Sequence, residues 1–236
     1  MWRAIIFDGD DTLWLTEPLY DAARQRAREV VEAAGLDGSD WERLERRLDV
    51  ANVERLGHTV ERFPTSCVEA YEALCGERAR PVDPVVRRET ADAARQVFEQ
   101  DPPLAPHARA VLTTLAEHGL RLALLTKGDR RIQDRRIDRS GLRDLFDEIQ
   151  VVDTKTVTEV RSMVERLGDR PVDVLSVGNS VRSDILPSLA AGVQPIWIDA
   201  HVWEYEKVQG DLPDGVIEVG DLSEVVKVAV PGLVVA

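Results

Sequence analysis

From residue 108 onward, short apolar segments alternate with helical patterns, and this alternation limits the possible folds more than any other feature of the sequence. Four segments have the length and composition of buried strands, at residues 121–125, 149–152, 172–177 and 194–198, and a shorter one lies at 216–219. Helical patterns lie between and after them, at residues 108–118, 129–139, about 156–167, about 183–191 and 221–229. Strands and helices that alternate through short links form parallel sheets covered by helices on both faces. We therefore predict an α/β fold with a doubly wound, mostly parallel sheet.

The first 106 residues add one strand and a helical insertion. Residues 3–7 (RAIIF) form an apolar run that ends in a dense acidic turn, which predicts another buried strand. Residues 16–100 show only helical patterns, and the proline-rich stretch 101–106 (DPPLAP) separates them from the alternating region. We therefore expect a Rossmann-like core made of residues 1–15 and 101–236, with an inserted all-helical domain at residues 16–100.

The chain carries an excess of acidic side chains, 43 Asp and Glu against 30 Lys and Arg, for a formal net charge of −13. Nucleic acids and anionic membranes are therefore not expected as partners, because both require a broad cationic face. A small anion could still bind in a local basic pocket. The arginines of residues 16–100 and the charged helix at 129–139 are interpreted mainly as solvated faces that pair with neighbouring acids.

Several features favour a cytoplasmic location. The first eleven residues already contain acids and show no signal-peptide pattern, and no apolar run approaches the about 18 residues of a membrane helix. Cys67 and Cys75 lie eight positions apart in a helical region and form no CxxC motif. Eight residues of helix span roughly 12 Å, which is too far for a disulfide, so we expect both cysteines to be structural.

Polar side chains follow four of the predicted strands, at the point where each strand ends. They are Asp8, Asp10, Asp11 and Thr12 after the first strand, Thr126 and Lys127 after the second, Lys155 after the third, and Asn179, Ser180 and Asp184 after the fourth. The carboxyl ends of parallel strands meet at one edge of a sheet, where α/β proteins bind ligands. Carboxylates that lie close together repel unless a cation separates them, and oxygen donors without histidine or thiolate suit Mg²⁺. A lysine and a hydroxyl could hold phosphoryl oxygens there, and a carboxylate could act as nucleophile.

Four motifs in this order resemble those of the haloacid dehalogenase (HAD) superfamily. They are DGDDT at residues 8–12, the hydroxyl of Thr126 after LRLALL, Lys155 within VVDTKT, and VGNSVRSD, which ends at Asp184. The helical insertion after the first motif is similar to the C1-type cap of this superfamily, so the resemblance covers nearly the whole chain. It implies a Mg²⁺-dependent phosphatase that acts on a small phosphorylated metabolite.

The resemblance also implies a role for each motif residue. Asp8 would be the nucleophile and a metal ligand, and Asp10 would be the general acid and base, with its backbone carbonyl on the metal. Thr126 would hydrogen-bond the phosphoryl group, and Lys155 would neutralise charge around the nucleophile and the phosphoryl group. Asp184 would bind or orient Mg²⁺.

Five positions depart from the family pattern or allow two interpretations. Asn179 stands where the family usually has Asp, and its amide oxygen could ligate Mg²⁺, directly or through water, but without charge. Lys127 is either a phosphate-binding residue or a surface lysine. Asp11 is either a solvated or helix-terminal acid or an acid that supports a metal ligand. Trp14 and Glu17 are either a packing aromatic and a first-turn acid or a substrate-facing wall between cap and core.

Three other functions fit the same motifs less well. A phosphomutase would pass the phosphoryl group from Asp8 to a sugar, and cap contacts would decide between the two reactions. A 2-haloacid dehalogenase uses the same first aspartate without metal and without an acid two residues later, so Asp10 argues against it. A non-catalytic ligand-binding member is suggested only by Asn179. The motifs specify neither the phosphate ester nor the oligomeric state, and we expect hinges for cap closure near residues 14–18 and 101–106.

Overall fold

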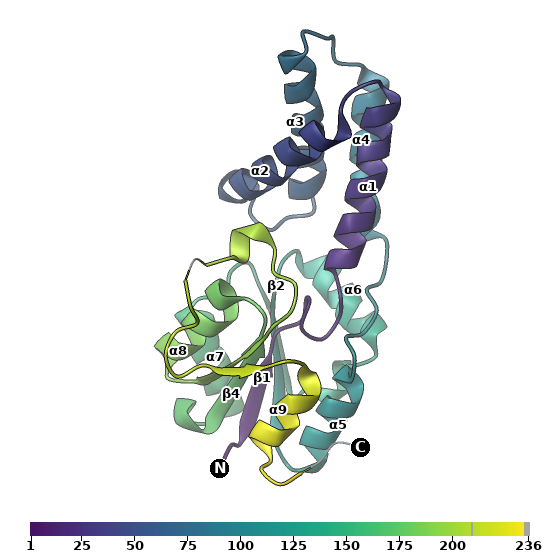
Figure 1. Ribbon diagram of the computed structural model, residues 1–236. Coiled ribbons are helices and arrows are strands. Elements are labelled where there is room, and N and C mark those ends of the chain that lie inside the picture. Colours follow the sequence, from purple (N-terminus) through teal and green to yellow (C-terminus); the bar gives the residue numbers. More distant parts are fainter. Residues whose placement is uncertain (209, 234–236) are drawn as a thin grey trace. The chain divides into compact units, whose positions relative to one another are not determined.

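The computed structural model of the chain describes residues 1–208 and 210–233, which form two compact units (Figure 1). The larger unit contains the chain up to Thr16 and again from Pro102, and the smaller unit comprises Glu17–Asp101. In these described ranges, no helix is long and apolar enough to cross a lipid bilayer.

The larger unit is built on a sheet of six parallel strands in the order β3-β2-β1-β4-β5-β6. The strands are β1 (Ala4–Phe7), β2 (Arg121–Lys127), β3 (Glu148–Val152), β4 (Val174–Gly178), β5 (Gln194–Ile198) and β6 (Ile217–Val219). β1 lies in the middle, with Phe7 opposite Leu124 of β2 and Val177 of β4. The prediction of a doubly wound, Rossmann-like parallel sheet is therefore confirmed. The order also places the ends of β1, β2 and β4 side by side.

Helices cover both faces of this sheet (Figure 1). One face packs against α5 (Ala108–Glu117), α6 (Arg130–Ser140) and α9 (Leu222–Ala229), and the other packs against α7 (Val157–Leu167) and α8 (Leu186–Ala191). Successive residues of β1 point to opposite faces, so Ile5 and Phe7 join the first apolar cluster, while Ala4 and Ile6 join the second. Burial on both faces explains why β1 and residues 122–125 of β2 are continuously apolar instead of alternating.

Two segments that flank β4, one before it and one after it, differ from the sequence-based prediction. The strand begins at Val174 and not at residue 172, because Pro171 opens a short 3₁₀ turn, Pro171–Asp173. The helix expected at about 183–191 is instead a π-helical turn, Val181–Ile185, followed by α8. Ser180 caps this turn by accepting a hydrogen bond from the Ser183 backbone at 3.0 Å. The turn positions Asp184 beside the end of β4.

The smaller unit consists of four helices and one 3₁₀ turn around its own apolar cluster. These elements are α1 (Glu17–Ala33), α2 (Gly38–Leu56), α3 (Arg62–Glu77), α4 (Pro84–Arg95) and the turn Gln96–Phe98. Trp41, Phe63 and Tyr71 provide the largest buried side chains. Cys67 and Cys75 are both free and buried in α3, as expected for structural cysteines.

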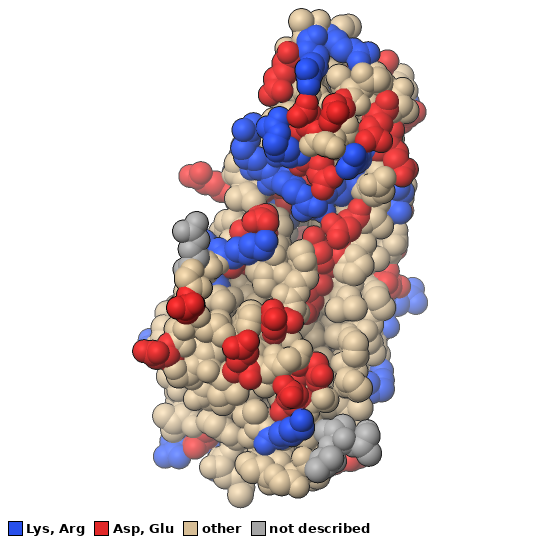
Figure 2. All heavy atoms as spheres, in the orientation of Figure 1, with Lys and Arg blue, Asp and Glu red and all other residues tan. Residues whose placement is uncertain are grey.

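Acidic and basic side chains lie next to each other over the smaller unit (Figure 2). Partly exposed pairs such as Arg28–Glu32 at 2.8 Å follow the expected pairing. Arg24 differs from this expectation, because it is buried and its guanidinium lies 2.9 Å from Glu45, whose side chain is 0% exposed. Burial raises the pKa of Glu45 to about 7 although Arg24 opposes the shift.

Candidate active site

Three charged side chains from different strand ends meet in the larger unit. Asp8 follows β1, Lys155 follows β3, and Asp184 lies in the turn after β4. The Lys155 ammonium contacts Oδ1 of Asp8 and lies 2.7 Å from Oδ1 of Asp184. The side chains of Lys155 and Asp184 are each 4% exposed, and that of Asp8 is 11% exposed. The fold therefore assembles a nearly dry cluster of two carboxylates around one ammonium.

The electrostatics of this cluster make Asp8 an unusual aspartate. Burial raises the pKa of Asp8, the Lys155 ammonium lowers it, and the charges of Asp184 and Asp10 raise it, with a result of about 7. Burial alone would lower the pKa of Lys155, but the two carboxylates outweigh this effect and raise the pKa well above its ordinary value. A single ammonium thus compensates the two carboxylates only in part, and additional positive charge would favour the ionised form of Asp8.

The turn that carries Asp8 is closed by its own backbone and by two threonines. The backbone N–H of Leu13 donates to the Gly9 carbonyl at 2.8 Å. The Thr12 hydroxyl lies 3.3 Å from Oδ2 of Asp8 and 3.4 Å from Oδ1 of Asn179, so it links the ends of β1 and β4. Asp11 adopts a positive φ of 59° and accepts hydrogen bonds from the backbone and hydroxyl of Thr16 at 2.8 and 2.7 Å. Asp11 therefore closes the turn, a role that neither of its sequence-based interpretations included.

Thr126 provides an unused donor next to this turn. It is the next-to-last residue of β2 and is 1% exposed, and its hydroxyl has no hydrogen-bond partner among the described residues. A methyl group added at Gly9 would lie 3.1 Å from this hydroxyl and 2.5 Å from the Trp14 ring, so only glycine fits between the two side chains. A buried hydroxyl without an acceptor suits a ligand oxygen at this position.

The carboxylate of Asp10 is held by three donors. Trp14 Nε1 donates to Oδ1 at 2.6 Å, and Gln133 Nε2 and Arg136 Nη1 both donate to Oδ2 at 2.9 Å. Trp14 is fully buried, as expected for a packing aromatic, while Glu17 lies in the first turn of α1. Gln133 and Arg136 are buried too, and they are exceptions in a helix whose other polar residues are partly or fully exposed, as predicted for residues 129–139. Their spacing, one turn apart and next to buried Ile137, is the sequence signal that could have identified them.

The two remaining candidates, Lys127 and Asn179, contact a different part of the chain. The Lys127 ammonium is paired with Glu206 and lies 2.8 Å from the Ser183 hydroxyl. In the described part of the chain it forms no ion pair with Asp8. Asn179 Nδ2 donates to the His201 carbonyl at 2.6 Å. Glu206 and the segment around it were not among the predicted site residues.

The oxygen donors around Lys155 fit a hard divalent cation. Asp8 and Asp184 provide carboxylates, the Asp10 carbonyl follows in the same turn, and the Asn179 amide oxygen lies near Thr12. No group of three or more His, Cys, Asp or Glu side chains forms a metal-ligand set within residues 1–208 and 210–233. Mg²⁺ commonly binds through one or two carboxylates and completes its shell with carbonyl, water and substrate oxygens, so this donor set suits it.

Comparison with known proteins gives one family. The sequence model of the haloacid dehalogenase-like hydrolases matches residues 2–192. The chain is 26% identical over 250 aligned positions to the phosphoserine phosphatase of Thermus thermophilus, covering 94% of this chain and 97% of that protein. It is 24% identical over 234 positions to the glyceraldehyde 3-phosphate phosphatase of Methanothermobacter thermautotrophicus, covering 88% and 90%.

A solved structure shares the fold. The haloacid dehalogenase-like hydrolase from Xanthomonas campestris superposes with a TM-score of 0.77 at 24% identity, covering 97% of this chain and 96% of that one. At this identity the likeness concerns the fold alone.

Proposed function

This chain belongs to the haloacid dehalogenase-like hydrolase family, and we propose that it is a Mg²⁺-dependent phosphatase that hydrolyses a small phosphorylated metabolite through an aspartyl phosphate on Asp8. The observation that carries the proposal is the buried cluster of Asp8, Lys155 and Asp184 beside the unpartnered hydroxyl of Thr126. Two relatives that align along most of the chain are named as phosphatases of small metabolites, which agrees with this activity.

In the first step, a carboxylate oxygen of Asp8 forms a bond to phosphorus, and the bond between phosphorus and the ester oxygen breaks. Asp10 gives a proton to the departing oxygen. Bound Mg²⁺ would supply the positive charge that keeps Asp8 ionised and neutralises phosphoryl oxygens. The Lys155 ammonium and the Thr126 hydroxyl stabilise the charge that develops on those oxygens.

In the second step, Asp10 takes a proton from water while the water oxygen bonds to phosphorus, and the bond to Asp8 breaks. The three donors around Asp10 hold its carboxylate in a fixed orientation. Trp14, Gln133 and Arg136 therefore position the acid and base of the reaction.

The test is hydrolysis of an aryl phosphate and of a panel of phosphorylated metabolites, with and without Mg²⁺. We expect turnover that is abolished by chelation and by Asp8→Asn. No hydrolysis across the panel by the folded protein would contradict the proposal. Halide release from 2-chloropropionate without metal would instead indicate a dehalogenase, and activation by a sugar bisphosphate would indicate a phosphomutase.

A further inference from the structure

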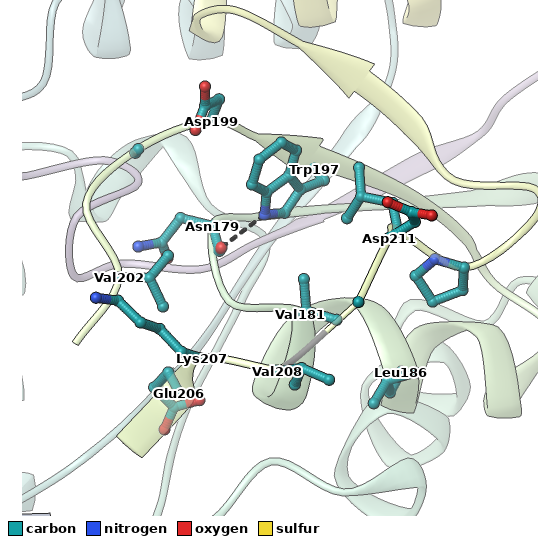
Figure 3. A pocket seen from close by; sticks show the side chains of 14 residues that line it. Asn179, Val181, Leu186, Trp197, Asp199, Val202, Glu206, Lys207, Val208 and Asp211 are labelled. Atoms are coloured by element: carbon teal, nitrogen blue, oxygen red, sulfur yellow. Dashed lines mark hydrogen bonds between the residues drawn. The ribbon is translucent and has the colours of Figure 1, made fainter. Parts of the chain in front are cut away.

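A segment between β5 and β6 lies against the end of β4. We call residues 199–207 the strap; it contains the short 3₁₀ turn Glu204–Glu206. The strap, Val181 and Trp197 line part of a cavity of about 420 Å³ beside Asn179 (Figure 3). The Arg182 guanidinium lies 5.0 Å from the ring centroid of Tyr205, which adds a contact between the strap and the turn after β4.

Glu206 is the centre of the contact between the strap and the larger unit. One carboxylate oxygen pairs with the Lys127 ammonium, and the other accepts hydrogen bonds from the hydroxyls of Ser180 and Ser183, each at 2.6 Å. Its side chain is 8% exposed. Burial would raise the pKa of Glu206, but Lys127 and the two hydroxyls outweigh this effect and hold the pKa at about 2. Glu206 is therefore a fully partnered carboxylate throughout the neutral range.

Each partner of Glu206 is the immediate chain neighbour of a candidate site residue. Lys127 follows Thr126, Ser180 follows Asn179, and Ser183 precedes Asp184. One carboxylate thus links the end of β2 to the residue that caps the turn after β4 and to the middle of that turn. Side chains that orient site residues from outside are often as important for geometry as the residues they hold.

A second contact between the strap and the end of β4 explains why residue 179 is an asparagine. The His201 carbonyl can only accept a hydrogen bond, and Asn179 Nδ2 donates to it at 2.6 Å. An aspartate at this position would place a carboxylate against a carbonyl oxygen with no proton between them. The departure from the family motif is thus matched by a contact that requires a donor.

We propose that Glu206 is a positioning residue that, through Lys127, Ser180 and Ser183, fixes Thr126, Asn179 and Asp184 around Asp8. In this view the Lys127 ammonium anchors the strap and is not a ligand of the substrate phosphate. The inference rests on the proposed phosphatase function for its kinetic consequence, while its structural consequence is independent of activity.

The test compares Glu206→Gln with Glu204→Gln, a matched control in the same turn whose side chain is 55% exposed and pairs with Lys207. Hydrogen exchange by mass spectrometry on the metal-free proteins reads local stability. We expect peptides that cover residues 126–128 and 179–184 to exchange about 10- to 100-fold faster in Glu206→Gln, because hydrogen bonds to a charged group are lost. Helix α5 should exchange as in the wild type, which separates local loosening from global destabilisation.

Kinetics and Mg²⁺ titration calorimetry complete the test. We expect Glu206→Gln to lower kcat and Mg²⁺ affinity about 10- to 100-fold with a smaller effect on KM, and Glu204→Gln to resemble the wild type. Ser183→Ala, which removes hydrogen bonds without removing a charge, should shift exchange and kcat in the same direction by less, and it keeps the test valid if Glu206→Gln does not fold.

Three outcomes overturn the inference. The first two are wild-type exchange and kcat in folded Glu206→Gln, and equal losses in Glu204→Gln. A large rise in KM for Lys127→Met with unchanged exchange at residues 179–184 would also overturn it, because it would make Lys127 a phosphate ligand. Absence of turnover in the wild type would contradict the proposed function instead, and the exchange comparison would still decide the role of Glu206.

Discussion

Replacing Asp8 by asparagine should stabilise the metal-free protein at neutral and alkaline pH, although it removes the nucleophile. The Asp8 carboxyl has a pKa of about 7 in the folded protein against 3.8 for an ordinary aspartate. The unfolded chain therefore releases this proton at lower pH than the folded protein, and the wild type loses stability as the pH rises between these values. A difference of about 3 pH units corresponds to about 4 kcal/mol at 1.36 kcal/mol per unit. Asparagine cannot ionise, so the variant escapes this loss.

Urea unfolding with a chelator present, at a series of pH values from about 4 to 8, measures the effect. We expect the free energy of unfolding of Asp8→Asn to match that of the wild type near pH 4 and to exceed it by up to about 4 kcal/mol near pH 8. Asp153→Asn, at an exposed position after β3, is the control and should stay within about 0.5 kcal/mol of the wild type. Added Mg²⁺ should reduce the difference in the free energy of unfolding between the two proteins, because it stabilises the wild type. A difference in the free energy of unfolding that does not change with pH, or a variant less stable than the wild type at pH 8, would refute the reasoning.

Three further substitutions test the packing within the two units. Arg24→Leu should reduce the free energy of unfolding, measured in urea, by about 3–5 kcal/mol near pH 8, because it leaves buried Glu45 without its partner. The reduction should be smaller near pH 5, where Glu45 can be protonated. The double variant with Glu45→Leu should recover most of the lost stability. Gly178→Ala should cost about 1–3 kcal/mol and weaken Mg²⁺ binding in calorimetry, because the added methyl would lie 2.3 Å from Oδ2 of Asp184. Gly76→Ala in α3 should instead stabilise by about 0.5–1 kcal/mol, since nothing lies within 4 Å of its added methyl.

The sheet could be predicted from the sequence because its strands are buried on both faces. The run at β1 is apolar throughout, and the run at β2 is apolar over residues 122–125. The turn Val181–Ile185 could not be predicted, because a π-helical turn and an ordinary helix show the same residue pattern. Its hydrogen bonds, including the cap from Ser180, exist only once the chain has folded.

Residues of the candidate site could be predicted where a side chain that can act on a phosphate or bind a metal follows a predicted strand. Asp8 follows β1 directly, and Lys155 and Asp184 lie in the segments that follow β3 and β4, so the sheet brings all three to the same edge. Glu206 does not follow a predicted strand and is one of several acids in the strap. Only its tertiary contacts with two serine hydroxyls and one lysine ammonium distinguish it from the others. Arg136 lies in a helix with many arginines, and its burial depends on the position of Asp10.

Identification of a phosphorylated Asp8 tests the central claim most directly. The protein is mixed with Mg²⁺ and a substrate that it hydrolyses, quenched in acid within one turnover, digested, and analysed by mass spectrometry. The account predicts a transient phosphoryl group on the peptide that contains Asp8, which disappears as phosphate is released and is absent in Asp8→Asn. Turnover that proceeds without phosphorylation of that peptide, or with phosphorylation elsewhere, would contradict it.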